Sequence, residues 1–152
     1  MGWGFKSFLT LLLLIAVPVY AGTPLSFDPA PKGLNFRLAR IALVEHIKPA
    51  EDTLQRVIPF STARFDLNQD GVPELFVKLL EEKFFCDSSG CDIFVLSVKS
   101  EGPKIIGTFR GSTLEVEAKK NKNHYNLKVL QAGGENFNFY EWQDANYTLQ
   151  ED

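Results

Sequence analysis

The alternation of apolar and polar residues after Pro59 is the feature that most constrains the fold. Leu75, Val77 and Leu79 are expected on one side of a strand and Phe76 on the other, because successive strand side chains point to opposite faces. Strands are predicted at 75–80, 93–98, 104–109, 114–118, 125–130, 137–142 and 145–149. Their short connections exclude parallel crossovers, so the sequence predicts an antiparallel meander.

Residues 34–58 precede these strands and carry a helical pattern. Apolar side chains at helical spacing are expected to face inward: Leu34, Leu38, Ile41, Ala42, Leu54, Val57 and Ile58. Pro49 has no amide hydrogen and clashes with the preceding turn, so two helices are predicted, with Pro49 near the start of the second. The predicted fold class is α+β, with N-terminal helices packed on a curled antiparallel meander of about six to eight strands. Residues 93–98 are apolar on both faces, which predicts a central strand covered on each side.

Residues 1–21 have the pattern of a secretory signal peptide. Lys6 precedes an apolar run at 8–17, and small residues lead to a cleavage site after Ala21. The run is about half of the ~20 residues that a transmembrane helix needs. We therefore predict removal of 1–21, no membrane anchor after cleavage, and a periplasmic or secreted bacterial protein.

The chain that remains suits one domain. Residues 22–33 are rich in proline and lack an apolar period, so they are predicted as an extended tether, and 34–152 as a single α+β domain. The formal net charge of the whole chain is −3, and loss of Lys6 makes it more negative. An electrostatic nucleic-acid binder needs a basic face, so nucleic acid is excluded as a partner.

The most specific motif is residues 66–74, with the sequence DLNQDGVPE. Oxygen side chains at positions 1, 3, 5 and 9, glycine at 6 and a carbonyl at 7 match the ligand order of a calcium loop. The predicted ligands of a structural Ca²⁺ ion are Asp66, Asn68, Asp70, the Val72 carbonyl and Glu74. Because these ligands would surround the ion and leave few open positions, a catalytic role is not expected.

The loop differs from an EF-hand, because its twelfth position is Val77 and the residues after it form a predicted strand. It resembles the shorter aspartate-rich loops of dockerins and integrin-type propeller repeats. The alternative is a hairpin turn composed of good turn residues. Three carboxylates within nine residues would repel each other in such a turn unless a cation or hydrogen-bond donors were present.

Cys86 and Cys91 flank a turn between two apolar strands. Export and an even cysteine count predict one disulfide. A redox-active pair is the alternative, but the spacing is Cys-x4-Cys and no helix follows. Metal binding by the thiols would need a second ligand pair. The disulfide would also rigidify the tip at Asp87, Ser88 and Ser89, which is a candidate partner-binding surface.

No catalytic residue is assigned from the sequence. His46 and His124 are single, and Ser112 lacks a nucleophile elbow. Glu115 and Glu117 share a strand face, where alternating glutamates indicate solvent exposure.

Aromatic residues crowd the strand at 137–142. Phe137 and Phe139 alternate with Tyr140 and Trp142, so both faces carry rings. Most are expected in the core, while Tyr140 and Trp142 are candidates for an exposed partner-binding patch.

Taken in order, the loop at 66–74, an apolar strand, Phe85–Cys91, a second apolar strand and a closing hairpin with Asn126–Val129 resemble a group of small exported bacterial proteins of uncharacterised function. The similarity covers residues 60–149, and the last motif diverges from that group's glycine-tryptophan pattern. The resemblance implies an exported protein with a disulfide and an ion loop.

Two functions of different class remain. The first is a non-catalytic interaction module that binds an envelope or secreted protein, as inhibitors and immunity proteins do. The second is a periplasmic hydrolase with an unrecognised carboxylate or metal site. The lack of a recognised catalytic constellation favours the first, and a deep pocket lined by convergent carboxylates or His124 would count against it.

Overall fold

The computed structural model describes residues 22–150, so the predicted signal peptide lies outside the described residues. Within this range the chain forms ten strands and two helices. These are β1 (Thr23–Pro24), α1 (Gly33–Leu54), β2 (Phe60–Phe65), β3 (Glu74–Leu79), α2 (Glu82–Phe85), β4 (Cys86–Asp87), β5 (Gly90–Lys99), β6 (Gly102–Gly111), β7 (Thr113–Asn121), β8 (His124–Leu130), β9 (Phe137–Gln143) and β10 (Asn146–Leu149).

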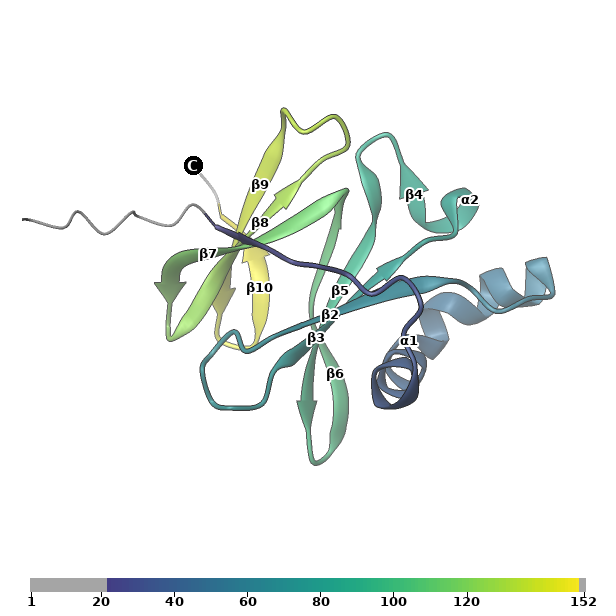
Figure 1. Ribbon diagram of the computed structural model, residues 1–152, viewed down its shortest axis with the longest axis horizontal. Coiled ribbons are helices and arrows are strands. Elements are labelled where there is room, and N and C mark those ends of the chain that lie inside the picture. Colours follow the sequence, from purple (N-terminus) through teal and green to yellow (C-terminus); the bar gives the residue numbers. More distant parts are fainter. Residues whose placement is uncertain (1–21, 151–152) are drawn as a thin grey trace, which may run out of the picture.

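The strands form two antiparallel sheets (Figure 1). The central sheet contains β2, β3 and β5, and both β4 and β6 pair with β5. The outer sheet has the order β1-β7-β8-β9-β10. Helix α1 packs on one face of the central sheet, and the outer sheet packs on the other. The antiparallel, β-rich character of the prediction is confirmed.

Alternation along the central strands explains this layering. Leu75, Val77 and Leu79 of β3 belong to the core shared with α1, whereas Phe76 belongs to the core shared with the outer sheet. In β5, Phe94 and Leu96 face α1, and Ile93 and Val95 face the other way. The predicted central strand covered on both faces is therefore confirmed.

The prediction of one curled sheet with six to eight strands is wrong. Ser112 alone separates β6 from β7, and its backbone N–H donates to the Leu130 carbonyl of the outer sheet at 2.7 Å. The chain therefore changes sheets at this corner. The extra strands include β1 and β4, which have two residues each and are too short to show an alternating pattern.

The prediction that residues 34–58 form two helices is also wrong, because the single helix α1 continues through Pro49. Its buried residues are Ala39, Leu43, Ile47 and Ala50, which form one stripe on both sides of the proline. An ion pair between Arg40 and Glu51 also spans Pro49. Packing of this continuous stripe outweighs the hydrogen bond that the proline cannot donate.

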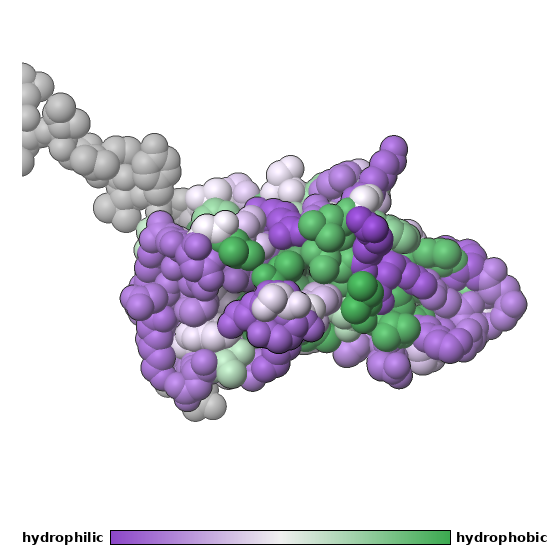
Figure 2. Space-filling view, turned by 90° about the horizontal axis from the view of Figure 1, so that it is seen from below, coloured by the Kyte–Doolittle hydropathy of each residue, from purple (hydrophilic) through white to green (hydrophobic). Residues whose placement is uncertain are grey.

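Three residues expected to face inward are exposed: Leu34, Ile41 and Val57, with 57%, 63% and 59% of their surface accessible. Hydrophobic surface gathers in the middle of the face seen in Figure 2, with hydrophilic surface on either side.

Across residues 22–150, neither helix combines the length and apolar character that crossing a membrane requires.

Residues 22–33, predicted as a tether, are held against the domain. Thr23 and Pro24 pair with β7, and the Leu25 N–H donates to the Leu114 carbonyl at 2.9 Å. Asp28 forms a bridge with Thr62. Leu25 also packs against the core between the sheets. The segment is extended as expected, but it completes one edge of the outer sheet.

Candidate functional site

The loop between β2 and β3, predicted to bind calcium, is closed by its own side chains. The Asp66 carboxylate accepts the backbone N–H groups of Asp70 and Gly71, at 3.1 and 2.8 Å. Asn68 Oδ1 accepts the same Asp70 N–H at 3.0 Å, and Asp70 accepts the Val72 N–H at 2.8 Å. The hydrogen bond from the Val72 N–H, and after it the one from the Asn68 side chain, lowers the pKa of Asp70. Oxygens of Asp66, Asn68 and Asp70 are thus gathered around one turn.

Glu74 has a different environment, because it begins β3 and is 4% exposed. Its carboxylate accepts the Leu67 N–H at 2.8 Å. Burial raises the pKa of Glu74, and the negative charges of Asp70 and Asp66 add to this effect. Burial likewise raises the pKa of Tyr147, to which the nearby Glu74 charge contributes.

The donor set agrees in type with a calcium loop, since carboxylate, amide and carbonyl oxygens are the ligands that Ca²⁺ prefers. Each carboxylate oxygen that accepts one N–H retains a lone pair for a cation. Asn68 turns its NH₂ towards Asp70, at 2.9 Å, so an ion would require its amide to rotate. In residues 22–150, no three acidic, histidine or cysteine side chains lie close enough together to hold a metal ion as arranged.

A cleft opens beside this loop, where turns from both sheets meet. Asn68 lines it from the β2–β3 loop and Glu74 from the start of β3. Lys99 and Lys104 line it from the β5–β6 hairpin, and Trp142 from β9. No local pattern in the sequence predicts this cleft, because its residues come from segments far apart in the chain.

His124 forms part of the wall of the same cleft. Its ring lies nearly parallel to the Trp142 indole, with 4.0 Å between ring centroids and 12° between planes. His124 Nδ1 is 3.2 Å from the Lys122 carbonyl oxygen. The polar turn predicted at His124 therefore contributes an imidazole to the cleft that the Glu74 carboxylate also lines.

The second predicted site is the hairpin at Cys86–Cys91. The two cysteines face each other across β4 and β5 and form a disulfide, with Cα atoms 3.9 Å apart. The predicted disulfide is therefore present in the structure. The Ala132 N–H donates to the Ser89 carbonyl at 2.9 Å, which attaches the tip to the β8–β9 loop.

Arg110, which the sequence reasoning missed, braces this hairpin from β6. Its guanidinium donates to Asp87 at 2.7 Å and to Asp92 at 2.5 Å. The Arg110 side chain lowers the pKa of the Asp87 carboxyl. Within the candidate tip, Asp87 is thus engaged and Ser89 is partly covered, while Ser88 is exposed.

Tyr140 and Trp142, proposed as an exposed patch, instead face the core between the sheets. Tyr140 packs on Phe109 with 4.4 Å between ring centroids. The exposed ring of β9 is Phe137, which lies on the opposite face and is 47% accessible. Alternation distinguished the two sets of rings but did not indicate which set faces the core.

No family model, no curated protein and no solved structure matches this chain.

Proposed function

We propose that the chain is an exported, calcium-binding interaction module that binds another envelope or secreted protein and has no catalytic activity of its own. In this proposal residues 1–21 are a signal peptide, and the protein acts in the periplasm or outside the cell. We also propose, as part of the same function, that the chain is related to the small exported bacterial proteins that residues 60–149 resemble.

The observation that carries the proposal is the rigidity of the Cys86–Cys91 hairpin. A disulfide, the Arg110 ion pairs and the bond between Ser89 and Ala132 all hold it. Its outermost residues, Asp87 and Ser88, are exposed. A surface that is already ordered loses little conformational entropy when a partner binds, which favours affinity.

Calcium would have a structural role in this proposal. Asp66, Asn68, Asp70 and the Val72 carbonyl would hold the ion, with Glu74 acting directly or through water. The ion would supply positive charge to a loop that now carries two exposed or half-exposed carboxylates beside a buried one. Calcium binding is expected to fix the conformation of the loop and to raise the free energy of unfolding of the protein.

A photo-crosslinking amino acid at Ser88 tests the proposed binding surface. The variant is expressed in the native envelope, and a matched variant carries the same group at Thr108, an exposed position on β6. The expected result is one discrete crosslinked protein from position 88 and none from 108. Equal crosslinking at both positions, or none at 88, would contradict the proposal.

A hydrolase is the second candidate, and the cleft beside the calcium-type loop favours it. A buried carboxylate with a raised pKa is a recognised feature of general acids. Glu74 has these properties, and His124 lines the same cleft. The Glu74 carboxylate is, however, engaged by the Leu67 N–H, which also gives it a structural role.

Two substitutions separate these functions. Glu74→Gln and His124→Ala should leave crosslinking from position 88 unchanged if the chain is an interaction module. If it is a hydrolase, the unmodified protein releases new reducing ends or amines from isolated envelope material, and both variants lose that activity. A protein that produces neither crosslink nor product would leave both candidate functions without support.

A further inference from the structure

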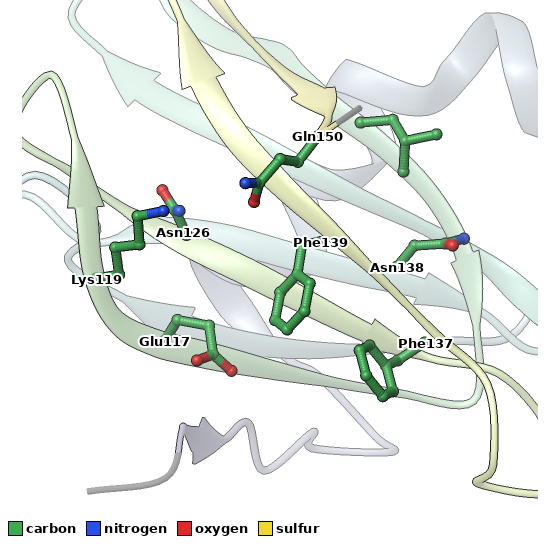
Figure 3. Close-up of a pocket in the computed structure, with 8 residues that line it drawn as sticks. Glu117, Lys119, Asn126, Phe137, Asn138, Phe139 and Gln150 are labelled. Atoms are coloured by element: carbon green, nitrogen blue, oxygen red, sulfur yellow. The ribbon is translucent and has the colours of Figure 1, made fainter. Parts of the chain in front are cut away.

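The outer sheet carries a groove on the face that points away from the central sheet (Figure 3). Residues of β7, β8 and β9 and the residue that follows β10 line it: Glu117, Lys119, Asn126, Phe137, Phe139 and Gln150. Figure 3 shows the Phe139 ring between the Phe137 ring on one side and the Glu117, Lys119 and Asn126 side chains on the other. The groove is separate from the β2–β3 loop and from the Cys86–Cys91 hairpin.

The groove lies over a break in the pairing of β7 with β8. The register between β7 and β8 passes from Val116 opposite Leu127 to Lys120 opposite Tyr125. Residues 117–119 of β7 therefore have only Asn126 opposite them on β8, and the regular pairing of the two strands is interrupted at this point. Bulges of this kind redirect side chains and occur often beside binding sites.

Asn126 is an unusual residue to find at the base of such a break. It is 2% exposed, and its side-chain oxygen has no hydrogen-bond partner. A buried polar atom without a partner is costly and rare in folded proteins. Rotation of the amide exchanges its oxygen and its NH₂, so Asn126 can offer either an acceptor or a donor to a ligand in the groove.

The rings beside Asn126 supply an apolar surface. Phe137 is 47% exposed and lies edge to face with Phe139, at 5.2 Å between ring centroids. Lys128 Nζ lies over the Phe137 ring, 4.7 Å from its centroid. Two neighbouring rings next to an unpartnered amide combine apolar contact with hydrogen bonding.

The charges of the lining residues, and the position of the groove on a sheet face, indicate which class of ligand it can bind. Glu117 and Lys119 line the same groove with opposite charges, which favours a neutral ligand. The backbone groups of β8 and β9 are already paired with each other, so an added peptide strand could not pair with these two strands. A sugar does not need backbone partners. Its hydroxyl and amide groups bind side chains, and its C–H faces pack on aromatic rings.

We propose that this groove binds a neutral oligosaccharide that carries N-acetyl groups. The acetamido N–H donates to the Asn126 oxygen, the acetamido methyl group packs against the neighbouring Phe139, and Phe137 packs on the C–H face of an adjoining sugar ring. Glu117, Lys119 and Gln150 bind sugar hydroxyl groups along the groove.

The test uses the chain from residue 22 onward and two soluble probes, tri-N-acetylchitotriose and cellotriose, which differ in their acetamido groups. Binding is measured by calorimetry and by chemical-shift changes in the Asn126 side-chain amide. Tri-N-acetylchitotriose is expected to bind roughly ten-fold or more tightly than cellotriose, since one lost hydrogen bond with its apolar contact is a difference of that order.

Three variants complete the test. Asn126→Leu removes the unpartnered oxygen, so it should unfold at the same or a higher temperature and yet lose binding. Phe137→Ala, at a half-exposed position, should weaken binding while remaining folded. Thr148→Ala is the control, because Thr148 is exposed on β10 and does not line the groove.

Lack of binding to tri-N-acetylchitotriose would overturn the proposal. Unchanged binding by Asn126→Leu, or an equal loss in Thr148→Ala, would do so too. Capture of extended peptides with changes at the Asn126 amide would replace the saccharide with a peptide ligand.

Discussion

Gly90 faces the backbone of Gly111 so closely that a β-carbon at position 90 would overlap the Gly111 carbonyl group. The same carbon would lie 2.6 Å from the Ser112 nitrogen. Gly90 also has a φ of 125°, which disfavours other residues. The disulfide hairpin therefore rests directly on the corner where the chain passes from the central to the outer sheet.

Gly90→Ala is expected to destabilise the protein because it adds both backbone strain and a clash. Gly102→Ala is the matched control, since Gly102 has a φ of 111° with nothing within 4 Å of an added β-carbon. The control should lose about 1–2 kcal/mol from backbone strain. Gly90→Ala should lose roughly 1–3 kcal/mol more from overpacking. Urea unfolding measures both, and equal losses would contradict the close contact.

Replacement of Cys86 and Cys91 by serine should lower the free energy of unfolding by about 2 kcal/mol, because the disulfide closes only a short loop. Reductant should have the same effect on the unmodified protein and none on the double variant. Mass spectrometry of the exported protein provides a direct check, and two free thiols there would refute the disulfide.

Calcium is expected to raise the thermal unfolding temperature of the unmodified protein. At a calcium concentration of about 100 times Kd, the stabilisation is about 2.7 kcal/mol. Asp66→Asn combined with Asp70→Asn should abolish this shift by removing two ligand charges. Asp144→Asn is the control, since Asp144 is exposed and lies outside the loop. Absence of calorimetric heat with the unmodified protein would contradict the site.

Glu74 should make the protein less stable as pH rises, when calcium is chelated. Burial raises its pKa in the folded state, so the folded protein holds this proton at pH values where the unfolded chain has lost it. The free energy of unfolding should therefore fall as pH rises from the ordinary glutamate pKa through the raised folded value. Glu74→Gln keeps an oxygen for the Leu67 N–H and should remove this decrease.

The pH dependence is measured as the difference between Glu74→Gln and the unmodified protein. Asp87 and Asp70 have lowered pKa values, so they act in the opposite sense and lose their stabilisation as pH falls. Both proteins contain Asp87 and Asp70, so the contribution of these two residues to the pH dependence cancels in the difference. A difference that is constant with pH would show that Glu74 does not titrate with a raised pKa.

Pro49→Ala should stabilise the protein by about 1–3 kcal/mol, since alanine can donate the helical hydrogen bond that proline lacks. Pro49 is exposed, so little packing is lost. Chemical denaturation provides the value. A loss of stability would indicate that the ion pair between Arg40 and Glu51 depends on the shape that Pro49 gives to α1.

The sequence predicted those parts of the fold that local patterns determine. Strand alternation placed Phe76 and Val77 on opposite faces correctly, and the even cysteine count together with expected export predicted the disulfide of Cys86 and Cys91. The break at Pro49 was predicted from a local preference that tertiary packing overrides. The single residue Ser112 between β6 and β7 gives no local sign that the chain changes sheets there.

The candidate sites, like the fold, combine features that local sequence determines with features that tertiary contacts determine. Hydrogen bonds within the turn at 66–71 connect close neighbours in sequence, so a motif can indicate them. The position of Arg110 against Asp87, or of His124 on Trp142, depends on how distant strands pair. The buried state of Glu74 likewise depends on which strands cover it, and no pattern in the loop indicates that.

Because alternate residues of β5 belong to two different cores, loss of either α1 or the outer sheet would expose one side of the same strand. The two layers therefore cannot melt independently. Among residues 22–150, amide protons in the β3–β5 ladder should be the last to exchange with deuterium, at a rate set by unfolding of the whole domain.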